Sequence, residues 1–301
     1  MKTAALEAQN TNLASTRGRI AADFAELVKA RLTLLVLLTT AVGFYLGAEP
    51  PVDYIALFHV VFGTAAAAAG AAALNQWWER RLDALMHRTR TRPIPAGRMR
   101  PLEGLILGAV LSIFGIGYLA IACNILSAVL AAITIVIYIF AYTPLKRTST
   151  ANTAVGAIPG AIPPMVGWAA ARGTVDAGAW SLFAILVLWQ LPHFFAIAWM
   201  YRDDYSRAGF RMISSDDSSG ERSASQSVFF CILLLIVAGL PASLGVVTMF
   251  YVPVELALGG LFIAVAMRFL RLRTRASACL LFIGSIIYLP LLLGALVLTK
   301  S

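Results

Sequence analysis

The chain has 301 residues, of which 59% are hydrophobic and 13% are charged; an ordinary soluble domain has roughly 45–50% and about 25%. This composition excludes a typical soluble domain and predicts an all-α, polytopic protein embedded in the lipid bilayer. A net charge of +9 would suggest nucleic acid as the partner of a soluble protein. In a membrane protein such a charge reflects topology, so no nucleic-acid partner is expected.

Nine apolar segments are long enough to cross the roughly 30 Å hydrocarbon core of a bilayer. They are residues 32–48, 54–74, 103–121, 125–142, 152–171, 179–200, 227–249, 252–270 and 277–299. The fifth contains Pro159, Pro163 and Pro164, which are tolerated in a span only where packing or a cavity satisfies the backbone. We therefore divide the chain into a polar N-terminal tail, residues 1–26, and one nine-helix membrane domain, residues 27–301.

The positive charges are distributed asymmetrically around these nine segments. If the N-terminus and the loops after even-numbered segments share one side, that side holds 22 of the 24 Lys and Arg residues. The positive-inside rule makes it the cytoplasmic side and places the C-terminus on the opposite side. The long loops 75–102 and 201–226 also lie there, so the working face is expected to be cytoplasmic. The three cysteines lie far apart in apolar runs, which predicts neither a disulfide nor a metal site.

The acidic residues are not explained by topology, because they contribute little to orientation. Asn75, Glu79 and Asp83 recur every four residues, so a helix would place all three on one face. A second acidic pair, Asp203–Asp204, follows the sixth segment. Carboxylate clusters of this kind suit Mg²⁺, which binds through one or two carboxylates together with substrate phosphates.

Cations near these acids can bind the anion that Mg²⁺ would bridge, since arginine and lysine match phosphate oxygens. They are Arg88, Arg92, Lys146, Arg147 and Arg202. A diphosphate site in an apolar bundle favours an allylic isoprenyl diphosphate, whose carbocation needs an aromatic, water-excluding pocket. Tyr142 and Trp189 are among the candidate aromatic residues. The competing interpretation pairs Glu79 and Asp83 with Arg80, Arg81 or His87 on a solvated helix end.

Two motifs identify a relationship. The first is N-x-x-x-[DE]-x-x-x-D followed by M-x-R-T-x-x-R-P-x-x-x-G, which Asn75 to Gly97 fit. It resembles the first motif of the intramembrane UbiA-type aromatic prenyltransferase family. The second is W-Q-x-P-H-F, Trp189 to Phe194, which is typical of the haem-directed branch of that family. The resemblance covers about residues 27–300.

The resemblance implies a nine-helix prenyltransferase in the bacterial inner membrane, with its active site open to the cytoplasm. It implies transfer of a farnesyl group from farnesyl diphosphate to a vinyl group of protohaem IX, giving a hydroxyethylfarnesyl substituent. Asn75, Glu79 and Asp83 would form the first Mg²⁺–diphosphate motif, and Asp203 with Asp204 the second. Arg88, Arg92 and Lys146 would contact diphosphate or haem propionates. A downstream haem-oxidising enzyme is a further candidate partner.

The chain departs from the family pattern at two positions of the first motif. Glu79 stands where many relatives have Asp, and Arg81 stands where many have a further Asp. The motif therefore has two acids instead of three, which leaves the number of metal ions open. His193 follows Pro192 within the sixth segment. It either contacts the porphyrin or its iron, or is a hydrogen-bonded structural histidine; a membrane histidine requires a cavity or a partner.

Two other functions remain open at this stage. One is a related enzyme that prenylates a smaller aromatic ring, such as a quinone precursor. The other is a transporter of a phosphorylated lipid or haem. Against a transporter, the two halves show no convincing internal repeat, and charge is concentrated at one face instead of at mid-membrane.

Overall fold

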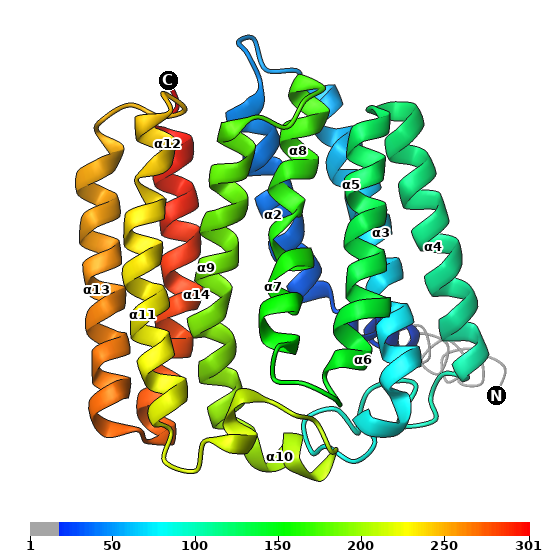
Figure 1. Ribbon diagram of the computed structural model, residues 1–301. Coiled ribbons are helices and arrows are strands. Elements are labelled where there is room, and N and C mark those ends of the chain that lie inside the picture. The colour runs from blue at the N-terminus through cyan, green and yellow to red at the C-terminus, as the bar shows by residue number, and fades with distance from the viewer. Residues whose placement is uncertain (1–17) are drawn as a thin grey trace, which may run out of the picture.

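The computed structural model describes residues 18–301, and these residues form a helical bundle (Figure 1). Nine helical segments within this part of the chain are long and apolar enough to cross a membrane. The all-α, nine-span prediction is therefore confirmed. The helices are α2 Ala30–Gly47, α3 Tyr54–Asp83, α4 Pro101–Ala122, α5 Ile125–Val136, η1 Ile137–Tyr142, α6 Thr143–Leu145, α7 Asn152–Ala161, α8 Pro163–Arg172, α9 Ala177–Met200, α10 Arg202–Arg207, η2 Ile213–Asp216, α11 Glu221–Ala238, α12 Leu240–Ser243, α13 Tyr251–Leu272 and α14 Arg275–Leu298.

Helix α3 extends well beyond the apolar run from which it was predicted. The run ends at residue 74, but the helix continues to Asp83. Asp53 caps its other end, accepting hydrogen bonds from the amides of Ile55 and Ala56 at 2.9 and 3.0 Å, which satisfies two amides of the first turn. The extension places Asn75, Glu79 and Asp83 on regular helix, as their spacing requires.

The seventh span begins earlier than its hydrophobicity indicates. We predicted residues 227–249, whereas the helical span runs from Glu221 to Ser243. Its first turns are polar, but Ser223 and Ser227 are buried and hydrogen-bonded within the protein. A hydropathy window cannot recognise polar side chains that are buried because local hydrogen bonds satisfy them.

The proline-rich fifth span is interrupted between α7 and α8. It lies against α2 through very small residues. A Cβ atom added to Gly43 would collide with the backbone of Pro164, and one added to Gly167 would collide with the carbonyl of Thr40. Small residues let helix backbones approach closely in membranes, where the hydrophobic effect does not drive helices together.

The fourth span changes its helical geometry near the predicted working face. Helix α5 passes into a π-helical turn, η1, and such turns frequently mark functional sites. Thr143 donates to the carbonyl of Tyr138 at 2.8 Å and accepts from the Asn75 amide at 3.1 Å. The π-helical turn is thereby tied to α3, and the rings of Tyr138 and Tyr142 stack with centroids 5.6 Å apart.

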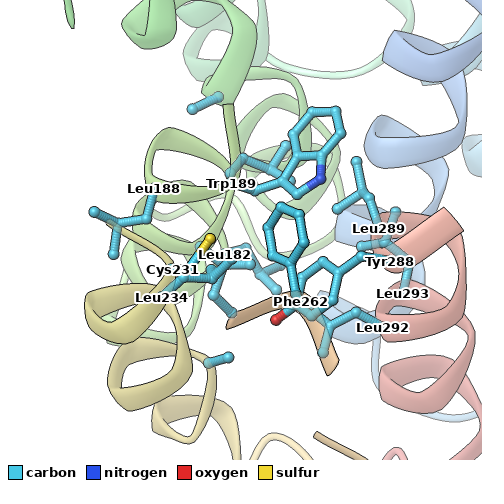
Figure 2. Packing of buried hydrophobic residues seen from close by; sticks show 14 of the residues in the cluster. Leu182, Leu188, Trp189, Cys231, Leu234, Phe262, Tyr288, Leu289, Leu292 and Leu293 are labelled. Atoms are coloured by element: carbon cyan, nitrogen blue, oxygen red, sulfur yellow. The ribbon is translucent and has the colours of Figure 1, made fainter. Parts of the chain in front are cut away.

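The largest apolar core joins α9, α11, α13 and α14 (Figure 2). Trp189 points from α9 towards α14, and its indole N–H donates to the carbonyl of Ser285 at 2.8 Å. Cys231 is packed in this core, and the three cysteines are free.

Candidate active site

A cavity of about 850 Å³ lies at the end of the bundle that carries α10 and the start of α2 (Figure 1). Charged and aromatic side chains from six helical segments and the loops between them surround it. Its lining comprises Ala25, Glu26, Lys29, Ala30, Arg31, Leu32, Glu79, Asp83, Met86, Arg88, Arg92, Tyr138, Tyr142, Lys146, Asn152, Thr153, His193, Phe194, Ile197, Tyr205, Phe210 and Met212. Seven of the thirteen predicted site residues therefore reach the cavity surface.

The two carboxylates of α3 are buried and paired with cations from distant loops. Glu79 accepts from Lys146 Nζ at 2.6 Å, and Asp83 accepts from Arg92 Nη1 at 2.7 Å. The structure therefore does not pair them with Arg80, Arg81 or His87. Arg81 is exposed and does not line the cavity, so the departure from the family pattern at this position leaves the two cavity carboxylates in place.

Asn75 lies on α3 one turn before Glu79 and is fully buried. Its side-chain oxygen accepts from Lys29 Nζ at 2.6 Å, while its amide donates to Thr143. Lys29 was not among the predicted site residues, because its charge was attributed to topology. Its backbone has φ 50°, a left-handed conformation that costs free energy in a non-glycine residue and occurs most often at functional sites.

Lys29 brings a third cation to the cavity beside Lys146 and Arg92. Burial, together with the nearby Arg92 charge, lowers the pKa of Lys29 to about 7. Burial alone would also lower the pKa of Lys146, but the Glu79 carboxylate beside it outweighs burial and raises that pKa. An anion entering the cavity would favour the charged form of both lysines.

Lys29 is a partly buried cation on the surface of the cavity that we predict to bind a diphosphate. We expect Lys29→Met to raise the KM for that diphosphate substrate about 10- to 100-fold, through loss of one charge-assisted hydrogen bond. Steady-state kinetics on purified protein measure this change. Arg19→Met is the matched control, since Arg19 is exposed and lies outside the cavity lining. Equal KM values for the two variants would contradict a contact between Lys29 and the diphosphate.

The second acidic pair divides into one buried and one exposed residue. Asp204 is 8% exposed, pairs with Arg207, and accepts from the backbone amide of Arg88 at 3.4 Å. The Asp203 side chain is 91% exposed and lies 3.8 Å from Arg202. Of these two acids, only Asp204 accepts a hydrogen bond from the loop after α3. Neither acid lines the cavity.

We expect Asp204→Asn to lower kcat/KM about tenfold or more, because Asp204 holds the loop that carries Arg88. Asp203→Asn should change kcat/KM by about twofold at most, as for an exposed charge with a weak partner. The two variants control for each other, since they remove the same charge from neighbouring positions of α10. A large loss with Asp203→Asn instead would mean that α10 rotates when substrate binds.

The remaining predicted residues differ in position. Tyr142 and Arg88 line the cavity; Lys146 Nζ lies 4.4 Å from the ring centre of Tyr142, and the Arg88 guanidinium lies 5.2 Å from that of Tyr201. Arg147 is exposed, and Arg202 stacks over Trp199 at 4.3 Å. Trp189 is in the core, one turn from His193, which does line the cavity. Arg147, Arg202 and Trp189 are thus outside the lining.

The donor atoms of this wall fit a magnesium ion held jointly with a phosphate. Within residues 18–301 no three His, Cys, Asp or Glu side chains converge on one point, so the protein alone does not form a complete metal cage. Glu79 and Asp83 supply hard carboxylate oxygens on adjacent turns, and Mg²⁺ usually completes its shell with substrate phosphates and water.

Comparison with known proteins identifies the family. The model of the UbiA prenyltransferase family matches residues 36–294. The chain belongs to the UbiA prenyltransferase family. It is 42% identical over 287 residues to protoheme IX farnesyltransferase of Solibacter usitatus, covering 92% of this chain and 98% of the relative. It is 45% identical over 279 residues to the protein of that name from Opitutus terrae, covering 92% and 94%.

Solved structures confirm the UbiA fold. A structure of digeranylgeranylglyceryl phosphate synthase aligns with a TM-score of 0.76 and 16% identity, covering 93% of this chain and 98% of that one. A UbiA homologue from Archaeoglobus fulgidus bound to GPP and Mg²⁺ aligns with a TM-score of 0.68 and 14% identity, covering 91% and 99%. As a member of this family, the protein is a membrane-embedded prenyltransferase.

Proposed function

We propose that this UbiA prenyltransferase transfers the farnesyl group of farnesyl diphosphate to a vinyl group of protohaem IX, giving the hydroxyethylfarnesyl product haem O. Relatives named protoheme IX farnesyltransferase that match more than nine-tenths of the chain support this assignment. The observation that carries it is the mixed lining of the cavity. Paired carboxylates and cations come from α3 and from the loops after α3 and α6, while His193 and Phe194 come from α9.

The paired carboxylates and cations of the cavity, called here the charged wall, bind and orient the diphosphate. Lys146, Arg92 and Lys29 now face Glu79, Asp83 and Asn75. Glu79 and Asp83 would hold Mg²⁺, and the three cations would then bind the phosphate oxygens. Bound Mg²⁺ would supply charge stabilisation for the departing diphosphate. Cations fixed before the reaction stabilise the same developing charge without reorganisation.

The aromatic part of the cavity protects the allylic cation. The rings of Tyr138 and Tyr142 come from the π-helical turn, and both side chains line the cavity beside the charged wall. Aromatic faces stabilise cations by several tenths to about 2 kcal/mol each, and the surrounding apolar side chains keep bulk water away from the allylic carbon. The vinyl group of the acceptor is then the nucleophile within reach.

We also propose that the cavity opens to the cytoplasmic side of a bacterial inner membrane. Within residues 18–301, the loops and helix ends on the cavity side of the bundle carry the Lys and Arg residues other than Arg172 and Lys300. That distribution supports a cytoplasmic N-terminus and a C-terminus on the opposite side. A haem-oxidising enzyme remains a candidate partner because it would consume the proposed product.

The direct test uses purified protein in lipid with protohaem IX, farnesyl diphosphate and Mg²⁺. Extracted haems are separated by chromatography and identified by mass. The expected product is protohaem with one farnesyl group and one hydroxyl group added across the vinyl double bond, and a chelator should abolish it. Diphosphate release with a phenolic acceptor but not with protohaem would instead indicate the quinone-precursor branch. Binding without turnover of any acceptor would contradict an enzymatic role.

A further inference from the structure

A hydrogen bond fixes which ring nitrogen of His193 carries the proton. His193 Nδ1 lies 2.7 Å from the hydroxyl oxygen of Ser285. Ser285 has a single hydroxyl hydrogen and donates it to the carbonyl of Phe282 at 2.6 Å. Since that hydrogen is already used, the hydroxyl oxygen must accept the hydrogen bond from His193. His193 therefore carries its proton on Nδ1, and its Nε2 keeps a free lone pair.

The surroundings hold the His193 ring in this orientation. The ring packs against Trp189 with centroids 5.2 Å apart and against Phe282 with centroids 4.9 Å apart. Trp189 also donates to the Ser285 carbonyl, which fixes α9 against α14 (Figure 2). His193 lines the cavity, and within the described chain its Nε2 has no hydrogen-bond partner. The lone pair is thus available to a molecule in the cavity.

The other basic groups of the cavity are already engaged. Glu79 and Asp83 are paired with Lys146 and Arg92, and they belong to the wall that receives the diphosphate. Glu26 lies near the surface and pairs with Arg98 at 3.2 Å. Lys29 also lines the cavity, but it donates to Asn75 and Tyr138 beside the two carboxylates of α3. His193 comes from α9 instead, and within the described residues it makes no ion pair.

We propose that His193 is the base for the water that completes the product, and that Ser285 is the residue that positions it. This inference rests on the proposed function. The C1–O bond of farnesyl diphosphate breaks, and diphosphate leaves with the electron pair. C1 bonds to the terminal vinyl carbon, which leaves a cation on the carbon attached to the porphyrin. Water oxygen bonds to that carbon, and one water proton passes to His193 Nε2.

The product mixture reports directly on this step. Without a base for the water, the same cation can lose a proton from the neighbouring carbon instead. That loss forms an alkene, and the farnesylated haem is then lighter by one water molecule. The ratio of hydrated to dehydrated product therefore measures the base, independently of how fast the farnesyl group is transferred.

The test compares two variants with wild-type protein in the haem assay. His193→Asn keeps an N–H group that can donate to Ser285 but lacks Nε2. Ser285→Ala keeps Nε2 but removes the acceptor that fixes the tautomer. We expect the ratio of hydrated to dehydrated haem to fall about 10²-fold in His193→Asn and about tenfold in Ser285→Ala.

Ser181→Ala is the matched control. Ser181 is also a buried serine of this bundle, and it donates to the carbonyl three residues earlier, as Ser285 does, at 2.7 Å. It should leave the product ratio unchanged. An unchanged ratio in both test variants would overturn the inference. Two further results would overturn the inference. One is a folded His193→Asn protein that forms no farnesylated haem. The other is a haem spectrum typical of a nitrogen ligand that wild-type protein shows and His193→Asn lacks.

The outcome also separates the inference from the function on which it rests. If the wild-type protein forms no farnesylated haem at all, the proposed function fails and the base assignment fails with it. If wild-type protein forms the hydrated product and the variants form it in the same ratio, the function stands and only the role of His193 is overturned.

Discussion

Asp83→Asn is expected to lower kcat roughly 10²- to 10³-fold while the protein remains folded in the membrane. Asp83 is 1% exposed, accepts from Arg92 at 2.7 Å and lies on the cavity wall. The asparagine side chain has nearly the same shape but lacks the negative charge. Arg92 then loses its anionic partner, and the proposed Mg²⁺ site loses one of the two carboxylates on α3. Turnover is measured by haem product and binding by titration with Mg²⁺ and inorganic pyrophosphate.

Asp53→Asn provides the control from the other end of the same helix. Asp53 caps α3, and asparagine caps helices about as well as aspartate, so this variant removes a charge without removing a contact. It should keep wild-type turnover and thermal stability in detergent. Wild-type kcat in Asp83→Asn would remove Asp83 from the catalytic machinery. Loss of pyrophosphate binding together with turnover would place it in the diphosphate site, as proposed.

Hydrophobicity and charge were sufficient to predict the bundle. Nine apolar segments and the one-sided distribution of Lys and Arg agree with the same topology, because omitting an internal span would move the later loops to the other side. The four-residue spacing of Asn75, Glu79 and Asp83 correctly predicted one helix face, because that spacing has one geometric consequence on a helix. Only the bounds differed, where polar side chains such as Ser223 are buried and hydrogen-bonded.

The partners of the site residues were not predictable in the same way. Asp203 and Asp204 are adjacent, and only the fold of the short helix α10 determines that Asp204 is the buried one. Lys29 was hidden among topological charges, and its contact with Asn75 spans 46 residues. The Ser285–His193 hydrogen bond spans 92 residues. Such contacts depend on how helices pack, which local patterns do not encode.

The ion pair between Lys146 and Glu79 makes the second large prediction. Both side chains are largely buried, at 14% and 6% exposure, and their charged atoms are 2.6 Å apart. Breaking a buried pair from one side costs about 3–5 kcal/mol, because the remaining charge is left without compensation. Lys146→Met should therefore lower thermal stability markedly. It should also abolish turnover, since it removes a cation from the diphosphate wall.

A double variant separates these two effects. In Lys146→Met with Glu79→Gln no buried charge is left unpaired, so stability should recover most of the loss, as measured by thermal unfolding in detergent. Turnover should remain lost, because both the cation and the carboxylate are absent. Recovery of turnover together with stability would mean that the pair only holds η1 and α6 against α3. Recovered stability without turnover would establish that the two buried charges are retained for binding the diphosphate. The fold alone does not require them.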